Sequence, residues 1–207
     1  GKYYWYVSTN WCGIGVAVSD KITGPYKDVL DKPLLTNKDC FDSHHSWACI
    51  DPAVFIDDDG QAYLTWGNRE CYIVKLKDNM IETEGEVKRI HIDESHPFTE
   101  APWIHKYNGK YYLTYASEWP EKIAYAVADH IEGPYETKGI ISEIAGNSNT
   151  THPAIVNFKG QWIFISHNGG LTTGTSYSRS VIAEPMEYNA DGSIKPIPPT
   201  AEGVKPL

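Results

Sequence analysis

The chain has 207 residues, of which 41% are hydrophobic and 13% aromatic, and this length suits one compact domain over residues 1–207. Its formal net charge of −9 argues against nucleic acid as a partner, and no apolar run approaches the roughly 20 residues that a membrane span needs. The aromatic content argues against disorder, and 17 Gly with 13 Pro argue against a helical bundle.

The strongest signal along the chain is internal repetition. The residues GKYY at 1–4 return at 109–112, and residues 14–26 (IGVAVSDKITGPY) return as residues 123–135 (IAYAVADHIEGPY). Two further copies of the turn and the strand after it begin at Gly60 and Gly160. The chain therefore contains four related segments.

Each segment holds short runs of β-branched and aromatic residues, such as 53–56, 62–66 and 111–115, separated by turn signals such as Asp59-Gly60 and Asn108-Gly109. A repeat of about 50 residues with three or four such strands predicts the blade of an all-β propeller. A β-sandwich is the alternative, but sandwiches do not repeat themselves with this fidelity.

Four cysteines, Cys12, Cys40, Cys49 and Cys71, lie in the first third of the chain. Their spacing matches no zinc or CxxC pattern. A disulfide and buried free thiols both remain open, so the cysteines do not fix the compartment.

Three polar residues occupy nearly the same place in the repeat, just before the first strand of a predicted blade. They are Asp51, Glu100 and His152, which precede Gly60, Gly109 and Gly160 by eight or nine positions. The first strand of a blade lines the propeller axis, so we expect the three side chains to converge on one axial pocket. Two carboxylates in such a pocket suit acid–base chemistry on glycosides. The alternative is that each is an ordinary polar turn before a strand.

Aromatic rings can stack on the apolar faces of sugars. Trp47, Trp66 and Trp103 lie close in sequence to these residues, and we expect them to border the pocket. Packing between strands of the blades is the alternative for each.

The motifs together resemble family 43 glycoside hydrolases, five-bladed β-propellers that act on arabinose- and xylose-containing polysaccharides. The matching stretches, which cover most of the chain, are IDPAVFIDDDGQAYLTWGN, EAPWIHKYNGKYYLTYAS, IAYAVADHIEGPYETKGII, THPAIVNFKGQWIFISHN and SYSRSVIAEPMEYNADGSIKPI. Their combination in this order is specific, although each would be weak alone.

The resemblance implies roles for individual residues. Glu100 matches the general acid, and Asp51 matches the carboxylate that orients this acid and tunes its pKa. His152 matches the axial histidine, and Arg179 matches an arginine that faces the pocket. The resemblance implies no redox or nucleotide cofactor, and it allows a calcium ion on the axis near His152.

One feature of the family is not found. Its third carboxylate, the general base, belongs to a turn of the first blade that would precede Gly1, together with the first strand of that blade. We therefore expect an incomplete first blade and an N-terminally truncated chain with little hydrolysis, and oligomerisation or disorder near residues 1–20. Asp39 and Asp42 lie in a polar loop and are interpreted as solvated carboxylates rather than as a replacement base.

The predicted function is that of an inverting, exo-acting glycosidase of the α-L-arabinofuranosidase or β-xylosidase type, whose two specificities the sequence does not separate. This substrate class favours an extracellular or periplasmic protein, with the cytoplasm left open. A carbohydrate-binding propeller that has lost catalysis is the alternative from another class. A purely structural scaffold is disfavoured by the convergence of carboxylates.

Overall fold

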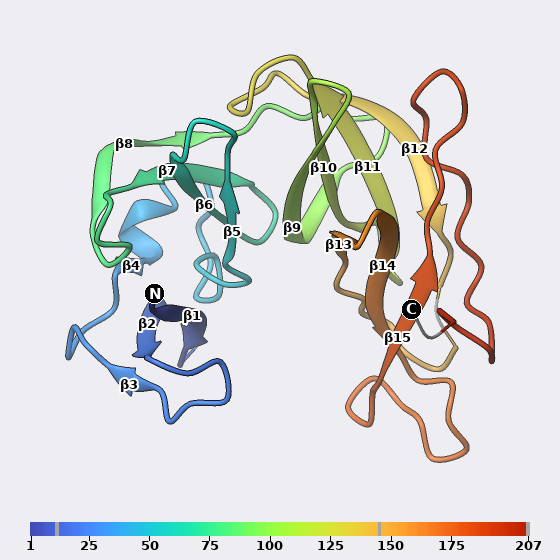
Figure 1. Cartoon of the computed structure of the whole chain (residues 1–207), viewed down its shortest axis with the longest axis horizontal. Coiled ribbons are helices and arrows are strands. Elements are labelled where there is room, and N and C mark those ends of the chain that lie inside the picture. The colour runs from blue at the N-terminus through green and yellow to red at the C-terminus, as the bar shows by residue number, and fades with distance from the viewer. Residues whose placement is uncertain (11–12, 145, 206–207) are drawn as a thin grey trace. The chain divides into compact units, whose positions relative to one another are not determined.

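A computed structural model describes residues 1–10, 13–144 and 146–205, which form strands β1 to β15 and one short 3-10 helix (Figure 1). Within these residues no helix is long and apolar enough to cross a membrane. The chain divides into two compact units, Gly1–Ile90 and His91–Leu207, and each is described separately below.

The first unit contains two antiparallel sheets. In one, β1 (Tyr3–Thr9) pairs with β2 (Gly13–Ser19), which also pairs with β3 (Lys27–Asp28) and β4 (Leu35–Thr36). The 3-10 helix (Asn37–Asp39) follows β4. The other sheet has the order β5 (Ala53–Ile56), β6 (Ala62–Trp66), β7 (Tyr72–Leu76) and β8 (Thr83–Arg89).

The second unit also contains two antiparallel sheets. The four strands of the first are β9 (Phe98–Tyr107), β10 (Lys110–Ser117), β11 (Lys122–Ala128) and β12 (Glu136–Ser142). The three strands of the second are β13 (Ala154–Phe158), β14 (Gln161–Asn168) and β15 (Ser180–Pro185). In both, neighbours in sequence are neighbours in the sheet, which is the up-and-down order of a propeller blade.

The repeated glycines close the same hairpin in three sheets. Gly60, Gly109 and Gly160 lie in the turns that join β5 to β6, β9 to β10 and β13 to β14, with φ of 87°, 75° and 84°. A glycine adopts this left-handed conformation without the steric penalty of a Cβ atom. The sequence repeat thus corresponds to a repeated blade, and the prediction of an all-β chain built from blades is confirmed.

The first sheet differs from the other three. Gly1 precedes β1 as Gly109 precedes β10, so β1 corresponds to the second strand of a blade. Among the described residues, β1 pairs only with β2, and no strand corresponds to β5, β9 or β13. The expected incomplete first blade is therefore found. Of the segment 1–20 in which disorder is expected, the described residues pair regularly from Tyr3 with Ser19 to Thr9 with Gly13, and residues 11–12 lie outside the described residues.

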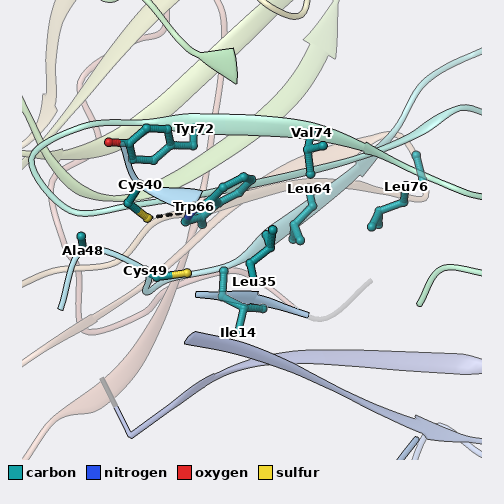
Figure 2. Close-up of a cluster of buried hydrophobic side chains, with 11 residues drawn as sticks. Ile14, Leu35, Cys40, Ala48, Cys49, Leu64, Trp66, Tyr72, Val74 and Leu76 are labelled. Atoms are coloured by element: carbon teal, nitrogen blue, oxygen red, sulfur yellow. Dashed lines mark hydrogen bonds between the residues drawn. The ribbon is translucent and has the colours of Figure 1, made fainter. Parts of the chain in front are cut away.

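A cluster of buried side chains forms the core of the first unit (Figure 2). Trp66 is fully buried there, stacks on Tyr72 with ring centroids 5.6 Å apart, and donates its indole N–H to Cys40 Sγ at 3.3 Å. Cys40, Cys49 and Cys71 are free and buried, which decides between the two alternatives for these three cysteines. Cys12 lies outside the described residues.

The core of the second unit joins its two sheets and includes the buried side chains of Ile123, Ile155 and Phe164. Tyr188 follows β15 and stacks on Tyr107 of β9, with ring centroids 3.6 Å apart and planes inclined by 3°. The two sheets of this unit therefore form one packed body, in which the side chains of the candidate site keep defined neighbours.

Leu64→Ala should lower the free energy of unfolding by about 2–5 kcal/mol, because Leu64 is 0% exposed and its removal leaves a cavity in the core. Ile56→Ala, on the adjacent strand β5, is the matched control. Ile56 is 59% exposed, so its truncation should change stability by no more than about 0.5 kcal/mol. Denaturant unfolding of both variants measures the difference, and equal losses would contradict the assigned core.

Candidate active site

In the loop before β5, Asp51 has a left-handed backbone conformation. Its φ is 58°, which is uncommon for a residue with a side chain. The next residue, Pro52, further restricts the backbone of Asp51. The surrounding hydrogen bonds compensate. The Asp51 N–H donates to Ser8 Oγ at 3.1 Å, and the Gly67 N–H donates to the Ile50 carbonyl at 2.9 Å. Asp51 is thus fixed at the start of its blade, as the repeat predicts.

The loop before β13 holds His152 at the corresponding place. The backbone N–H of Thr151 donates to the carboxylate of Glu121 at 2.8 Å, and its hydroxyl contacts the Ser166 hydroxyl at 2.8 Å. Both partners are buried. His152 and Pro153 follow directly and lead into β13.

Glu100 is placed differently from the prediction. It does not precede its strand but lies inside β9, opposite Ala116 of β10. The pairing of β9 with β10 shifts on both sides of this position, because β9 has an additional residue between Trp103 and Glu100 and another between Glu100 and Phe98. These two β-bulges flank Glu100, and bulges commonly change the direction of a side chain beside an active site.

Ala101 adopts a left-handed conformation in the first of these bulges. Its φ is 60°, it is fully buried, and it precedes Pro102. A non-glycine residue in this conformation costs on the order of 1–3 kcal/mol and persists only where the surrounding structure enforces it. Such strain clusters at functional sites, and here it lies next to the candidate acid.

The pKa of His152 depends on two other predicted residues of the second unit, Glu100 and Arg179. Burial lowers the pKa of His152, the negative charge of Glu100 raises it, and the positive charge of Arg179 lowers it. Both charged groups are therefore close enough to act on the imidazole. The resemblance gives roles to four residues. Three of them, Glu100, His152 and Arg179, belong to the second unit, and Asp51 belongs to the first.

His167 of β14 is a member of this group that the sequence analysis missed. Its Nε2 lies 3.1 Å from the Thr150 carbonyl, which accepts a hydrogen bond from the neutral ring. The Arg179 guanidinium lies 3.3 Å from the same nitrogen and donates to the Thr150 hydroxyl at 3.3 Å. Burial, then the charge of Arg179, lowers the pKa of His167 to about 4. One signal in the sequence could have indicated His167, because residues 166–168 (Ser-His-Asn) form a polar end to a largely apolar strand.

The arrangement combines a carboxyl group, a guanidinium and two imidazoles that are neutral near pH 7. Neutral imidazoles can donate or accept hydrogen bonds, and guanidinium donates several in a fixed plane. Such a group can hold an uncharged, hydroxyl-rich ligand, and the carboxyl group of Glu100 can transfer a proton to it.

The three predicted pocket tryptophans differ in exposure. Trp66 is fully buried in the core, so the prediction that it borders a sugar pocket is wrong, and its ring packs the blade instead. Trp103 is half-buried and donates its indole N–H to the Ile155 carbonyl at 2.8 Å. Trp47 is 44% exposed and lies beside His45, with ring centroids 4.9 Å apart. Trp47 and Trp103 keep accessible surface.

Asp39 and Asp42 both have structural partners. Asp39 accepts the backbone N–H of Thr36 at 2.8 Å and caps the 3-10 helix. Asp42 accepts a hydrogen bond from Arg89 at 3.2 Å. These contacts agree with the interpretation of both residues as loop carboxylates.

A calcium site on His152 is not supported by the donor groups. Among the described residues, no three or more His, Cys, Asp or Glu side chains are arranged to hold a metal ion. Calcium also prefers six to eight oxygen ligands, which an imidazole does not supply.

Residues 1–194 match the sequence model of glycosyl hydrolases family 43. A β-xylosidase from Xylanibacter ruminicola is 33% identical to this chain over an alignment of 242 positions that covers 95% of this chain and 71% of that enzyme. The chain therefore belongs to glycosyl hydrolase family 43 and is a glycosidase by family.

Solved structures agree with the fold. An α-L-arabinofuranosidase from Clostridium thermocellum superposes with a TM-score of 0.82 at 38% identity, covering 99% of this chain and 71% of that one. A β-xylosidase/α-arabinofuranosidase from a compost metagenome, solved with xylotriose in a calcium-free form, gives 0.82 at 31% identity, covering 96% and 70%. The predicted family and propeller fold are confirmed, with part of a five-bladed propeller present in this chain.

Arg179→Ala should raise the pKa of His167 from about 4 toward the ordinary value near 6.5, because it removes a positive charge and part of the cover of the ring. Histidine ring signals followed by NMR over pH 3–8 measure the shift. Lys159→Ala, in the turn at the other end of β14, removes an equal charge and should leave His167 unchanged. An unaltered titration in Arg179→Ala would contradict the proposed electrostatic contact.

Proposed function

We propose that this glycosidase removes xylose or arabinose units from the ends of arabinose- or xylose-containing oligosaccharides and polysaccharides, with inversion at the anomeric carbon. The observation that carries the proposal is the position of Glu100, which lies between two β-bulges, and whose charge acts on His152, in a family 43 chain. The relatives support the pentose class, because they include a β-xylosidase, an α-L-arabinofuranosidase and a complex with xylotriose.

In the proposed mechanism Glu100 is the general acid. Its proton goes to the glycosidic oxygen as the bond to the anomeric carbon breaks, and a water activated by a base attacks from the opposite face. In inverting enzymes the two carboxyl groups stand about 6.5–9.5 Å apart to leave room for this water. The base is not assigned to a residue of this chain.

Asp51 is proposed as the carboxylate that tunes Glu100. Its part depends on its place in the repeat and on the family resemblance, since the two residues belong to different units. A nearby negative charge raises the pKa of a carboxylic acid and keeps it protonated near neutral pH. The hydrogen bond from the Asp51 N–H to Ser8 Oγ fixes the backbone of Asp51, as the proposed role requires a carboxylate of defined orientation.

The remaining residues are proposed to bind sugar. Arg179 and His152 can hydrogen-bond to sugar hydroxyls, because guanidinium donates and a neutral imidazole does either. Trp47 and Trp103 keep exposed ring surface on which a sugar face can stack.

A propeller that binds these sugars without hydrolysing them is the second candidate. One observation favours it. The two loop carboxylates that the sequence analysis weighed as a replacement base, Asp39 and Asp42, both have structural partners, so neither is suited to that role.

The proposal predicts that wild-type protein releases xylose or arabinose from xylotriose or arabinoxylan, with the product anomer inverted as read by ¹H NMR at early times. From the sequence we instead expect little hydrolysis because no general base is assigned, so this measurement decides between the two expectations. Binding of xylotriose by calorimetry without any release would support the binding propeller instead. Absence of both binding and release would contradict both candidates.

Glu100→Gln should slow hydrolysis of xylotriose by about 10²–10⁴-fold, because a poor leaving group needs protonation. Hydrolysis of a nitrophenyl xyloside should fall much less, since nitrophenolate leaves without a proton. Glu136→Gln, an exposed carboxylate on β12 of the same sheet, is the matched control and should change neither rate. Equal losses on the two substrates in Glu100→Gln would count against the acid role.

A further inference from the structure

Glu121 is a buried acidic residue in the turn between β10 and β11. It is only 1% exposed, and a buried carboxylate is costly unless it is well hydrogen-bonded. Its Oε2 accepts the backbone N–H of Thr151 at 2.8 Å, and its own N–H donates to the Asn149 carbonyl at 3.1 Å. One residue of the β10–β11 turn thus holds the loop before β13 at two points.

This loop carries groups of the candidate site on both sides of the Glu121 contact. Thr150, on one side, accepts from Arg179 and from His167, and His152 follows on the other. Other bonds hold the loop from the β14–β15 side, including that of the Asn149 N–H to Ser176 Oγ at 3.1 Å. A shift of the Thr151 backbone would therefore displace groups of the site directly.

The first unit contains a similar bond. There the Asp51 N–H donates to the side chain of Ser8, which belongs to β1 of the preceding sheet. In both units, a side chain from one sheet accepts a backbone N–H from the loop that leads into the next sheet. At Glu121 the acceptor is a carboxyl group, and a hydrogen bond to a carboxylate is stronger than one to a hydroxyl.

We propose that Glu121 is a positioning residue that fixes the loop 148–152 and thereby the position of His152. It acts through the Thr151 backbone and does not touch the substrate. The description of His152, Glu100 and Arg179 as site residues rests on the proposed function, whereas the position of the imidazole can be measured without any sugar.

The test compares three variants of the full 207-residue chain. Glu121→Ala removes the acceptor, and Glu121→Gln retains an oxygen that can accept the Thr151 N–H. Glu184→Ala is the matched control, because Glu184 is also buried, at 2% exposed, and accepts the Thr200 N–H at 2.6 Å on the outer strand β15. The first measurement is the NMR titration of His152 without ligand.

The expected results separate positioning from general loss of stability. In wild-type protein His152 should titrate below 6.5. In Glu121→Ala its pKa should rise toward that value as the freed loop exposes the ring to water. Glu121→Gln and Glu184→Ala should keep the wild-type titration, even if Glu184→Ala is less stable. A wild-type titration in folded Glu121→Ala would overturn the proposal.

Amide hydrogen exchange in the wild-type protein provides a test that does not depend on the folding of a variant. The Thr151 amide should be protected, because its hydrogen bond to Glu121 is buried. Exchange of this amide at the rate of an exposed loop would overturn the proposal.

Xylotriose binding then links the loop to function. Affinity should fall about tenfold in Glu121→Ala and remain near wild type in Glu121→Gln and Glu184→Ala. Failure of wild-type protein to bind xylotriose would contradict the proposed function alone, since the His152 titration would still decide the role of Glu121. Equal affinity in wild type and Glu121→Ala would contradict positioning.

Discussion

Antiparallel pairing between the first two strands of each sheet determines where the candidate site residues lie. In β5–β6 and β13–β14 this pairing is regular, so the first strand begins directly after Asp51-Pro52 and after His152-Pro153. In β9–β10 it is interrupted twice, and the interruptions surround Glu100. A period of two residues governs which face of a strand each side chain occupies, so additional residues change its direction. Glu100 therefore differs from Asp51 and His152 in backbone geometry as well as in residue type.

The repeat explains how much of this could be predicted from sequence. Turn glycines such as Gly109 and the alternation of short strands were sufficient to predict blades, because both follow from local backbone rules. The bulges around Glu100 could not be predicted, since spacing to Gly109 counts residues and does not reveal which of them are paired. Trp66 was misassigned for a related reason. The sequence around a tryptophan does not reveal whether its ring faces a pocket or the core. The ring of Trp66 faces the core and packs against Tyr72.

The residues that sequence reasoning missed act through the tertiary structure. His167 joins Arg179 and Thr150 only because β14 pairs with β15 and the loop before β13 lies across them. Burial and the guanidinium keep this imidazole neutral, and the charge of Glu100 works in the opposite direction on His152. The group thus places the carboxyl group of Glu100 and the guanidinium of Arg179 near two imidazoles.

Glu121 shows why neighbouring blades of the second unit cannot vary independently. The turn after β10 supplies the acceptor for the loop before β13, so a change in one sheet alters the position of a residue that belongs to the next. The candidate site takes Glu100 from the first of these sheets and His152 from the loop that leads into the second, and Glu121 lies in the turn between β10 and β11. The buried carboxylate of Glu121 thereby connects the sheet that contains Glu100 to the loop that contains His152. Their relative position consequently depends on a hydrogen bond within the protein, which is in place before any substrate binds.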